Sequence, residues 1–315
     1  MSRNRLDWAR DGSDWPNREA SRFVRAAGLS WHVQRMGAGP QILLLHGTGA
    51  STHSYRRLAR LLEERCDVFA PDLPGHGFSD PLPYRRLSLP GMSDAVGSLC
   101  AKLGVAPEIV VGHSAGAAVA IRMTLDGLIS PRAIVSVNGA LLPIWTGFSA
   151  PFFASAAKLL AANPIAPWLF ARRARDPATV DRLLRGTGSK IADEDARFYR
   201  RLAGTTSHVA GALGMMAGWD LKAFGCDLGR LETPLILVAG TRDGMVPASS
   251  AEAVRRLAPR TRIVRLEGLG HLAHEEAPEL VRDVIEGALS DQAPAGPKDP
   301  FEVAVGERMG EPAHV

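Results

Sequence analysis

The 315-residue sequence has few cysteines, little excess charge and no long uninterrupted hydrophobic run. Its three cysteines, Cys66, Cys100 and Cys226, are odd in number and do not have the spacing of metal ligands. They predict buried core thiols in a reducing compartment, with neither a disulfide nor a zinc site.

The basic residues exceed the acidic ones only slightly, and the formal net charge is +4. The densest basic cluster, Arg172, Arg173 and Arg175, has no interleaved aromatic residues that could stack on nucleic-acid bases. We therefore expect no nucleic-acid partner.

The sequence also predicts neither a targeting segment nor a transmembrane helix. The first twenty residues are polar and lack the apolar segment and cleavage pattern of a secretory signal, which predicts a cytoplasmic location. The longest apolar stretch, residues 143–170, is interrupted by prolines, a lysine and an asparagine. It is too broken for the roughly 20 apolar residues of a transmembrane helix, and is more typical of short helices with an apolar face.

Strand-like runs dominate the first half of the chain. They occupy residues 22–24, 30–34, 42–45, 68–70, 109–111 and 134–137. The first two are separated by Gly28 and predict a β-hairpin at a sheet edge. The other four are continuously apolar, like parallel strands buried on both faces, and helix-like segments 55–64 and 89–103 lie between them. The alternation predicts an α/β protein with a mostly parallel, doubly wound sheet.

Helix-like segments replace this alternation after residue 138. They occupy residues 150–162, 166–173, 177–184, 194–202 and 207–217. Strands resume at 235–238 and 262–266, with helices at 248–257 and 278–289. We therefore predict an N-terminal arm (1–20), an α/β core (21–142 and 223–289), an inserted helical cap (143–222) and a disordered tail (290–315).

A Gly-x-Ser-x-Gly sequence at 112–116 directly follows the strand at 109–111 and precedes a helix-forming run at 117–125. This order is that of a nucleophile elbow, in which a serine sits on a strained strand-to-helix turn. Small residues are needed at 112 and 116 because side chains there would collide with neighbouring backbone. Ser114 is therefore the candidate nucleophile.

A serine hydroxyl needs a base, and the base needs an orienting acid. Asp243 follows the strand at 235–238, and His271 follows the strand at 262–266, in the order expected after Ser114. Asp220 and Asp227 are alternative acids. His274 is an alternative base, disfavoured because it is expected to lie on the next helix.

Two backbone N–H groups should hold the oxyanion, and those of Thr48 and Ala115 fit. Thr48 lies in a glycine-containing loop at 46–51 that resembles a phosphate cradle but has neither a P-loop ending nor a dinucleotide-binding glycine pattern. We therefore expect no nucleotide and no other cofactor. The polar residues around this loop lack metal-ligand spacing, which predicts no metal site; they are His46, His53, Asp72 and His76.

The predicted cap is rich in large apolar side chains, some of which would form its own core. Those expected to line a substrate cavity above the serine are Phe148, Phe152, Phe153 and Trp168. Such a lining favours a hydrophobic or bulky substrate over a small charged one.

Together these motifs make the chain resemble the α/β-hydrolase superfamily with an inserted cap, over about residues 21–289. The resemblance rests on HGTGAS (46–51), DLPGHGFS (72–79), GHSAG (112–116), GTRDGMVP (240–247) and GLGHLAHEEAPE (268–279). The N-terminal half, with WPNR at 15–18, SRFV at 21–24 and WHVQ at 31–34, is similar to the hydrolase-like magnesium-chelatase accessory proteins of bacteriochlorophyll synthesis. This likeness implies a role in tetrapyrrole synthesis beside the magnesium-inserting step and a possible contact with magnesium chelatase.

Two classes of function stay open. The first is a serine hydrolase that cleaves an ester or related acyl bond; carbon–carbon hydrolases and cofactor-free haloperoxidases also keep the serine. Haloalkane dehalogenases and epoxide hydrolases are disfavoured because those relatives have an aspartate where this chain has Ser114. The second class is a non-catalytic porphyrin-binding accessory protein. An intact but unused elbow would store backbone strain without benefit, which counts against it.

Overall fold

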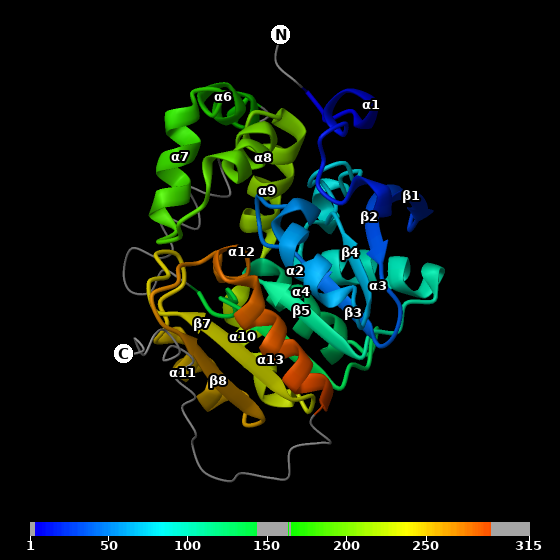
Figure 1. Cartoon of the computed structure of the whole chain (residues 1–315), viewed down its shortest axis with the longest axis vertical. Helices are drawn as coiled ribbons and strands as arrows, with labels where there is room; N and C mark the ends of the chain where they lie inside the picture. Colours follow the sequence, from blue (N-terminus) through cyan, green and yellow to red (C-terminus); the bar gives the residue numbers. More distant parts are fainter. Residues whose placement is uncertain (1–3, 144–162, 164, 291–315) are drawn as a thin grey trace, which may run out of the picture.

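The computed structural model describes residues 4–143, 163 and 165–290. Their centre is an eight-stranded sheet with the strand order β1-β2-β4-β3-β5-β6-β7-β8 (Figure 1). The strands are β1 (Ser21–Ala26), β2 (Leu29–Met36), β3 (Gln41–Leu45), β4 (Asp67–Pro71), β5 (Ile109–His113), β6 (Ala133–Val137), β7 (Leu235–Gly240) and β8 (Thr261–Leu266). Every strand predicted from the sequence is confirmed.

The sheet combines an antiparallel edge with a parallel centre. β1 and β2 form the predicted hairpin, and β2 also pairs antiparallel with β4. From β4 through β8 all neighbours are parallel. The prediction of a mostly parallel, doubly wound α/β sheet is therefore confirmed.

Helices cover both faces of this sheet, as alternation along the strands requires. Ile42 and Leu44 of β3 pack with helices α2 (Arg56–Leu62) and α13 (Pro278–Ser290). Leu43 and Leu45 point the other way and belong to the cluster over the opposite face. The helices on that face are α3 (Leu89–Leu103), α4 (Ala115–Leu125), α10 (Leu221–Asp227) and α11 (Ser250–Leu257).

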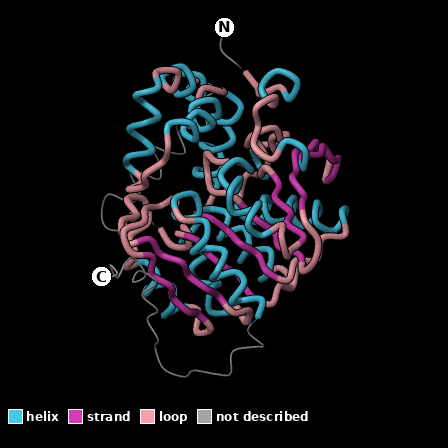
Figure 2. The backbone as a smooth tube through the Cα atoms, viewed as in Figure 1, coloured by secondary structure: helices cyan, strands magenta, loops and turns pink. Residues whose placement is uncertain are grey.

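Four of the described helices between β6 and β7 gather at one end of the sheet (Figures 1 and 2). They are α6 (Ala166–Arg173), α7 (Pro177–Gly186), α8 (Asp193–Ala203) and α9 (Thr206–Gly218). We call α6 to α9 with their connecting loops the interstrand helices. They confirm the helices predicted after residue 165, whereas the one predicted at 150–162 lies outside the described residues, as does the tail from 291.

Short helices complete the fold. In the described ranges, the remaining α-helices are α1 (Trp8–Asp11) and α12 (Ala273–Glu276), and the 3-10 helices are Arg18–Ala20, Thr52–Tyr55, Tyr84–Arg86 and Leu228–Arg230. The segment before β1 is packed against the molecule: Trp15 is buried and its ring lies 4.9 Å from that of Phe78 and 5.5 Å from that of Phe198 on α8. Trp15 therefore joins the N-terminal segment to the interstrand helices.

One cysteine prediction is wrong. Cys66 and Cys100 are buried and free, but Cys226 is exposed. It lies on α10, whose buried face is formed by Phe224 and Gly225. The next residue of such a short helix turns toward solvent, so Cys226 is not a core thiol.

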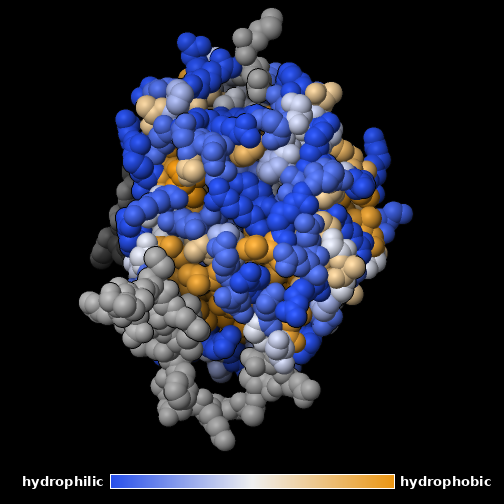
Figure 3. Space-filling model, in the orientation of Figure 1, coloured by the Kyte–Doolittle hydropathy of each residue, from blue (hydrophilic) through white to orange (hydrophobic). Residues whose placement is uncertain are grey.

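The surface of the molecule is mostly polar on the face that Figure 3 draws. On the face drawn in Figure 3, hydrophobic residues form small separate groups within a mostly hydrophilic surface. Among the described helices, none is long and apolar enough to cross a membrane.

Candidate active site

Ser114 occupies the turn between β5 and α4, with φ 51° and ψ −116°. A non-glycine residue with positive φ is strained, and the surrounding hydrogen bonds hold it there. Its N–H donates to the carbonyl of Val137 at 3.0 Å, and its carbonyl accepts from Ala117 and Ala140 at 3.2 and 3.1 Å. The candidate nucleophile thus has the backbone strain expected of an elbow.

The two glycines of the motif are required by space. A Cβ added to Gly112 would lie 2.4 Å from the backbone nitrogen of Ala117, and one added to Gly116 would lie 2.1 Å from the carbonyl oxygen of Leu45. Both distances are far below van der Waals contact. The sequence therefore lets α4 start directly against β3 and β5, which fixes where Ser114 sits.

Asp243 and His271 come together although 28 residues separate them. The Nδ1–H of His271 donates to Oδ2 of Asp243 at 2.8 Å, which leaves Nε2 of the imidazole as the acceptor. The other carboxylate oxygen of Asp243 accepts from the N–H groups of Met245 and Val246 at 2.7 and 2.8 Å. Among the described residues no hydrogen bond joins Ser114 Oγ to His271.

The alternative acids and base have other surroundings. Asp220 accepts from backbone N–H groups at the start of α10, and Asp227 pairs with Arg122 at 2.8 Å. His274 lies on α12, where it is fully buried and neither ring nitrogen has a partner in the described part of the chain. Burial, with the positive charge of neighbouring groups, lowers the pKa of His274 to about 3, so its ring stays neutral.

Two residues that the sequence analysis did not single out hold the backbone of His271. The carbonyl of His271 accepts from Nε2–H of His113 at 3.0 Å and from the side-chain amide of Asn138 at 2.8 Å. The carbonyl oxygen of the same amide accepts from the N–H of Gly240 at 2.7 Å. Asn138 follows β6 directly, so its place at the carboxyl end of a strand was the available signal.

The turn between α7 and α8 contacts the acid loop and the base loop together. The carbonyl of Thr187 accepts from the N–H of Gly244 at 3.1 Å and from the N–H of His271 at 3.0 Å. Ser189 Oγ accepts from the N–H of Leu272 at 2.8 Å. The interstrand helices therefore brace both loops.

Thr48 and Ala115, the predicted oxyanion donors, lie in a turn after β3 and at the start of α4. Thr48 lies in a four-residue turn closed by a 3.1 Å hydrogen bond from Ala50 N–H to the carbonyl of Gly47. Ala115 is the first residue of α4, where N–H groups lack partners within the helix. Neither N–H is bonded to an acceptor within the described ranges.

A second Ser–His–Asp series lies in the same molecule. Ser21 Oγ is 3.0 Å from Nε2 of His32, whose Nδ1 is 2.8 Å from Asp72. His32 and Asp72 are fully buried, and Ser21 lies at the start of β1 rather than on a strained turn. Asp72 also accepts from two backbone N–H groups, so this series organises loops.

The histidines near the loop at 46–51 also have structural bonds. Nε2 of His46 accepts from the N–H of Leu73, and its Nδ1–H donates to the carbonyl of Gly47. Nδ1 of His53 lies 2.7 Å from Ser51 Oγ. His76 contacts the carbonyl of Pro74. No group of His, Cys, Asp or Glu with the geometry of a metal site occurs in the part of the chain that the structure describes.

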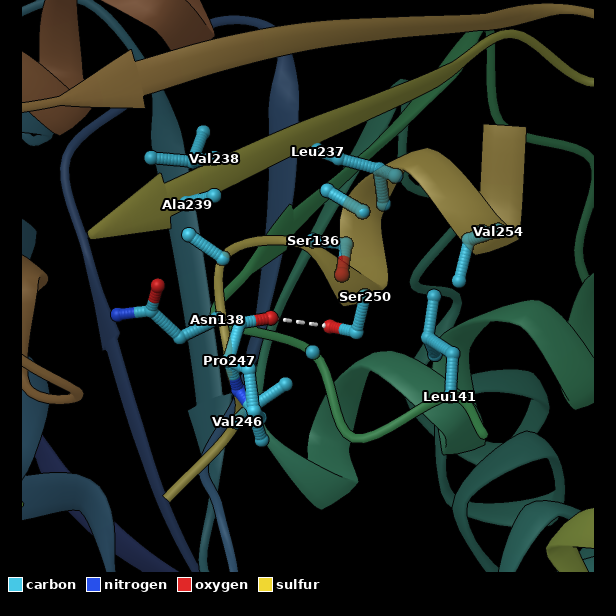
Figure 4. Close-up of a pocket in the computed structure, with 13 residues that line it drawn as sticks. Ser136, Asn138, Leu141, Leu237, Val238, Ala239, Val246, Pro247, Ser250 and Val254 are labelled. Atoms are coloured by element: carbon cyan, nitrogen blue, oxygen red, sulfur yellow. Dashed lines mark hydrogen bonds between the residues drawn. The ribbon is translucent and has the colours of Figure 1, made fainter. Parts of the chain in front are cut away.

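A cavity of about 20 Å³ lies between β6, β7 and α11 (Figure 4). It is lined by Asn138 and by Ser136, whose buried hydroxyl has no partner among the described residues. This volume suits one water molecule and is far too small for a substrate. The cavity is therefore not a substrate site.

The predicted cavity lining is described only in part. Phe148, Phe152 and Phe153 lie outside the described residues. Trp168 lies on α6, is 38% exposed, and has the guanidinium of Arg172 5.7 Å from its ring centre. Its place over Ser114 stays a prediction.

The chain matches the α/β-hydrolase-fold family over residues 40–278 and therefore belongs to that family. It resembles the magnesium-chelatase 30 kDa subunit of Rhodobacter capsulatus, with 38% identity over 281 residues, 87% of this chain and 98% of the relative.

A second relative is less similar. A pimeloyl-acyl-carrier-protein methyl ester esterase of Aeromonas hydrophila is 27% identical over 271 residues, 82% of this chain and 98% of the relative. Among solved structures, an α/β-hydrolase-fold protein from Burkholderia ambifaria has a TM-score of 0.70 at 22% identity, covering 84% of this chain and 97% of its own. An esterase from Exiguobacterium antarcticum has a TM-score of 0.70 at 17% identity, covering 85% and 99%. These two likenesses concern the fold.

Proposed function

We propose that this α/β hydrolase cleaves an ester or related acyl bond with Ser114 as nucleophile, His271 as base and Asp243 as orienting acid. The observation that carries the proposal is the 2.8 Å hydrogen bond from His271 to Asp243, which leaves the opposite ring nitrogen free to accept a proton. The strained backbone of Ser114 supports the same assignment.

The reaction follows from these roles. Ser114 Oγ attacks the acyl carbon as His271 Nε2 takes the hydroxyl proton, and the N–H groups of Thr48 and Ala115 hold the oxyanion. When the tetrahedral intermediate collapses, the leaving group takes the proton from His271 and the acyl group stays on Ser114. Water, deprotonated by the same imidazole, then releases the acid and restores the serine.

The substrate is proposed to be hydrophobic. The apolar composition of the predicted cap at 143–222 supports this, and Trp168 with the three phenylalanines would contact it. The name of the Rhodobacter capsulatus relative supports a place beside magnesium chelatase in tetrapyrrole synthesis and a contact with that enzyme. A cytoplasmic location belongs to the same proposal.

The second candidate is a porphyrin-binding accessory protein without catalysis. The relative's name favours it, because a subunit of a chelatase need not hydrolyse anything. Carbon–carbon hydrolase and haloperoxidase chemistry would use the same serine and remain variants of the first proposal.

One experiment separates the two candidates. Hydrolysis of p-nitrophenyl esters from acetate to dodecanoate is measured beside protoporphyrin binding, for the wild type and for Ser114→Ala. An enzyme with an apolar cavity gains up to about 0.8 kcal/mol in transition-state binding per buried methylene, and only the wild type turns over. Equal porphyrin binding by both proteins with no turnover of any ester would contradict the hydrolase.

A further inference from the structure

His208 lies on α9, yet both nitrogens of its ring bond to loops that follow strands of the sheet. Its Nε2–H donates to the carbonyl of Gly49 at 3.0 Å, and its Nδ1 accepts the N–H of Gly77 at 3.1 Å. A carbonyl can only accept, so these bonds define one neutral tautomer. His208 is 2% exposed, which keeps water from replacing either bond.

Gly49 belongs to the turn that carries Thr48. It is the third residue of the turn Gly47–Ala50 and has φ 77°, in the left-handed region. The Gly49 carbonyl and the Ala50 N–H belong to one planar peptide group, and the Gly47 carbonyl and the Thr48 N–H belong to another. The 3.1 Å bond from the Ala50 N–H to the Gly47 carbonyl joins the two groups, so a restraint on the Gly49 carbonyl also restrains the direction of the Thr48 N–H. Nδ1–H of His46 also donates to the Gly47 carbonyl at 2.8 Å, so the peptide that carries the Thr48 N–H is held directly by His46 and, through the bond from Ala50, by His208.

Helix α9 packs closely against the loop at 72–79, which limits the movement of His208. A Cβ on Gly211, one helical turn after His208, would lie 2.3 Å from the carbonyl oxygen of Gly75. The ring of His76 lies 5.1 Å from that of His208, edge to face. Helix α9 therefore approaches the loop at 72–79 as closely as backbone allows, and the imidazole is fixed between two loops.

We propose that His208 is a positioning residue that aims the Thr48 N–H at the oxyanion. This proposal rests on the proposed hydrolase function, because it assigns Thr48 a role in that reaction. In this proposal the interstrand helices position a reacting group through His208, in addition to any contact that they make with substrate.

Two variants test the two bonds separately. In His208→Gln the amide nitrogen can reach the place of Nε2 and donate to Gly49, whereas in His208→Asn the amide is too short and can replace only the bond to Gly77. Each variant keeps one of the two hydrogen bonds, so their thermal midpoints should fall by similar amounts. The measurements are kcat and KM for a p-nitrophenyl ester, and amide hydrogen exchange of residues 46–51.

His208→Asn should lower kcat at least about tenfold with KM within about threefold of the wild type, because a misaimed donor weakens transition-state binding. His208→Gln should stay within about threefold in both constants, and exchange at 46–51 should be faster in Asn than in Gln. Equal kcat values in the two variants, with an active wild type, would overturn the proposal. If the wild type neither hydrolyses esters nor reacts with a fluorophosphonate, the proposed function fails, and equal exchange at 46–51 still refutes the restraint by His208.

Discussion

At the scale of single residues, the site depends on which histidine meets a carboxylate. His271 and His274 lie three residues apart and both pack near the ring of His113, with centroid distances of 4.8 and 4.4 Å. Only His271 is bonded to Asp243, whereas His274 is buried with both ring nitrogens unpartnered among the described residues. Distance to the His113 ring therefore does not distinguish the two histidines, whereas the hydrogen bond to Asp243 does.

This difference predicts opposite results for the two substitutions. His271→Ala should lower kcat for an activated ester by a factor on the order of 10⁴ or more, because nucleophile and base act as a unit. His274→Phe, which keeps a ring in an apolar site, should stay within about tenfold of the wild type. Steady-state kinetics on both purified variants check this, and a large loss in His274→Phe with an active His271→Ala would reverse the assignment of the base.

At the scale of elements, the turn between α7 and α8 is where the interstrand helices meet the loops of Asp243 and His271. Gly188 in this turn has φ 76°, and a Cβ there would lie 1.8 Å from the carbonyl oxygen of Arg242. Gly186, two residues earlier, has open space around its Cβ position. The two glycines form a natural pair for comparison.

We expect Gly188→Ala to lower both the thermal midpoint and kcat, since the added methyl must push the acid loop away. The strain should cost roughly 1–3 kcal/mol of unfolding free energy. Gly186→Ala should leave both quantities nearly unchanged, because Gly186 is the last residue of α7 and a helix accepts alanine at least as well as glycine. Thermal denaturation and ester kinetics measure the two effects, and identical behaviour of the variants would refute the role of this turn.

A buried ion network joins three helices nearby. Arg56 of α2 contacts Asp195 of α8 and Glu275 of α12, each at 2.5 Å, and its side chain is 8% exposed. Arg57 also reaches Asp195, at 2.8 Å, but is 48% exposed. Solvent screens the second pair and not the first.

Substitution of the buried Arg56 should therefore lower the unfolding free energy far more than substitution of Arg57. Arg56→Met would leave two buried carboxylates without their main partner and should lower the unfolding free energy by about 3–5 kcal/mol. Arg57→Met should lower it by less than about 1 kcal/mol. Urea denaturation of both variants tests this, and losses of equal size would mean that burial does not set the strength of the network.

The elements themselves were predictable from the sequence, but the contacts between them were not. Apolar runs such as 109–111 identify buried strands by local pattern, and the glycines around Ser114 identify the elbow by spacing. The roles of Asn138, His113 and His208 depend on which loops the fold brings together, which no local pattern contains. The exposure of Cys226 likewise depends on which face of α10 meets the sheet.

At the scale of the whole molecule, buried neutral histidines set the response to acid. Burial is the largest cause that lowers the pKa of six of them: His46, His53, His76, His113, His208 and His274. The pKa of His208 falls to about 4, against about 6.5 in an unfolded chain. Between these two values the unfolded chain binds more protons than the folded protein.

The contribution of these histidines to the unfolding free energy should therefore be fully present above about pH 6.5 and should fall as the pH decreases toward 4. We expect the thermal midpoint to drop by more than about 5 °C between pH 7.5 and pH 5. His274→Phe removes one of these groups and should show a smaller drop. Scanning calorimetry across this range provides the measurement, and a midpoint at pH 5 equal to or above that at pH 7.5 would contradict the expectation.

The central claim is that Ser114 is a nucleophile activated by His271, and covalent labelling tests it most directly. A fluorophosphonate reacts with an activated serine and forms a stable adduct that intact-mass and peptide mass spectrometry locate. We predict one adduct per wild-type chain, on Ser114, a strongly slowed reaction in His271→Ala, and no adduct in Ser114→Ala. An adduct on another residue, or none on folded wild-type protein, would contradict the claim.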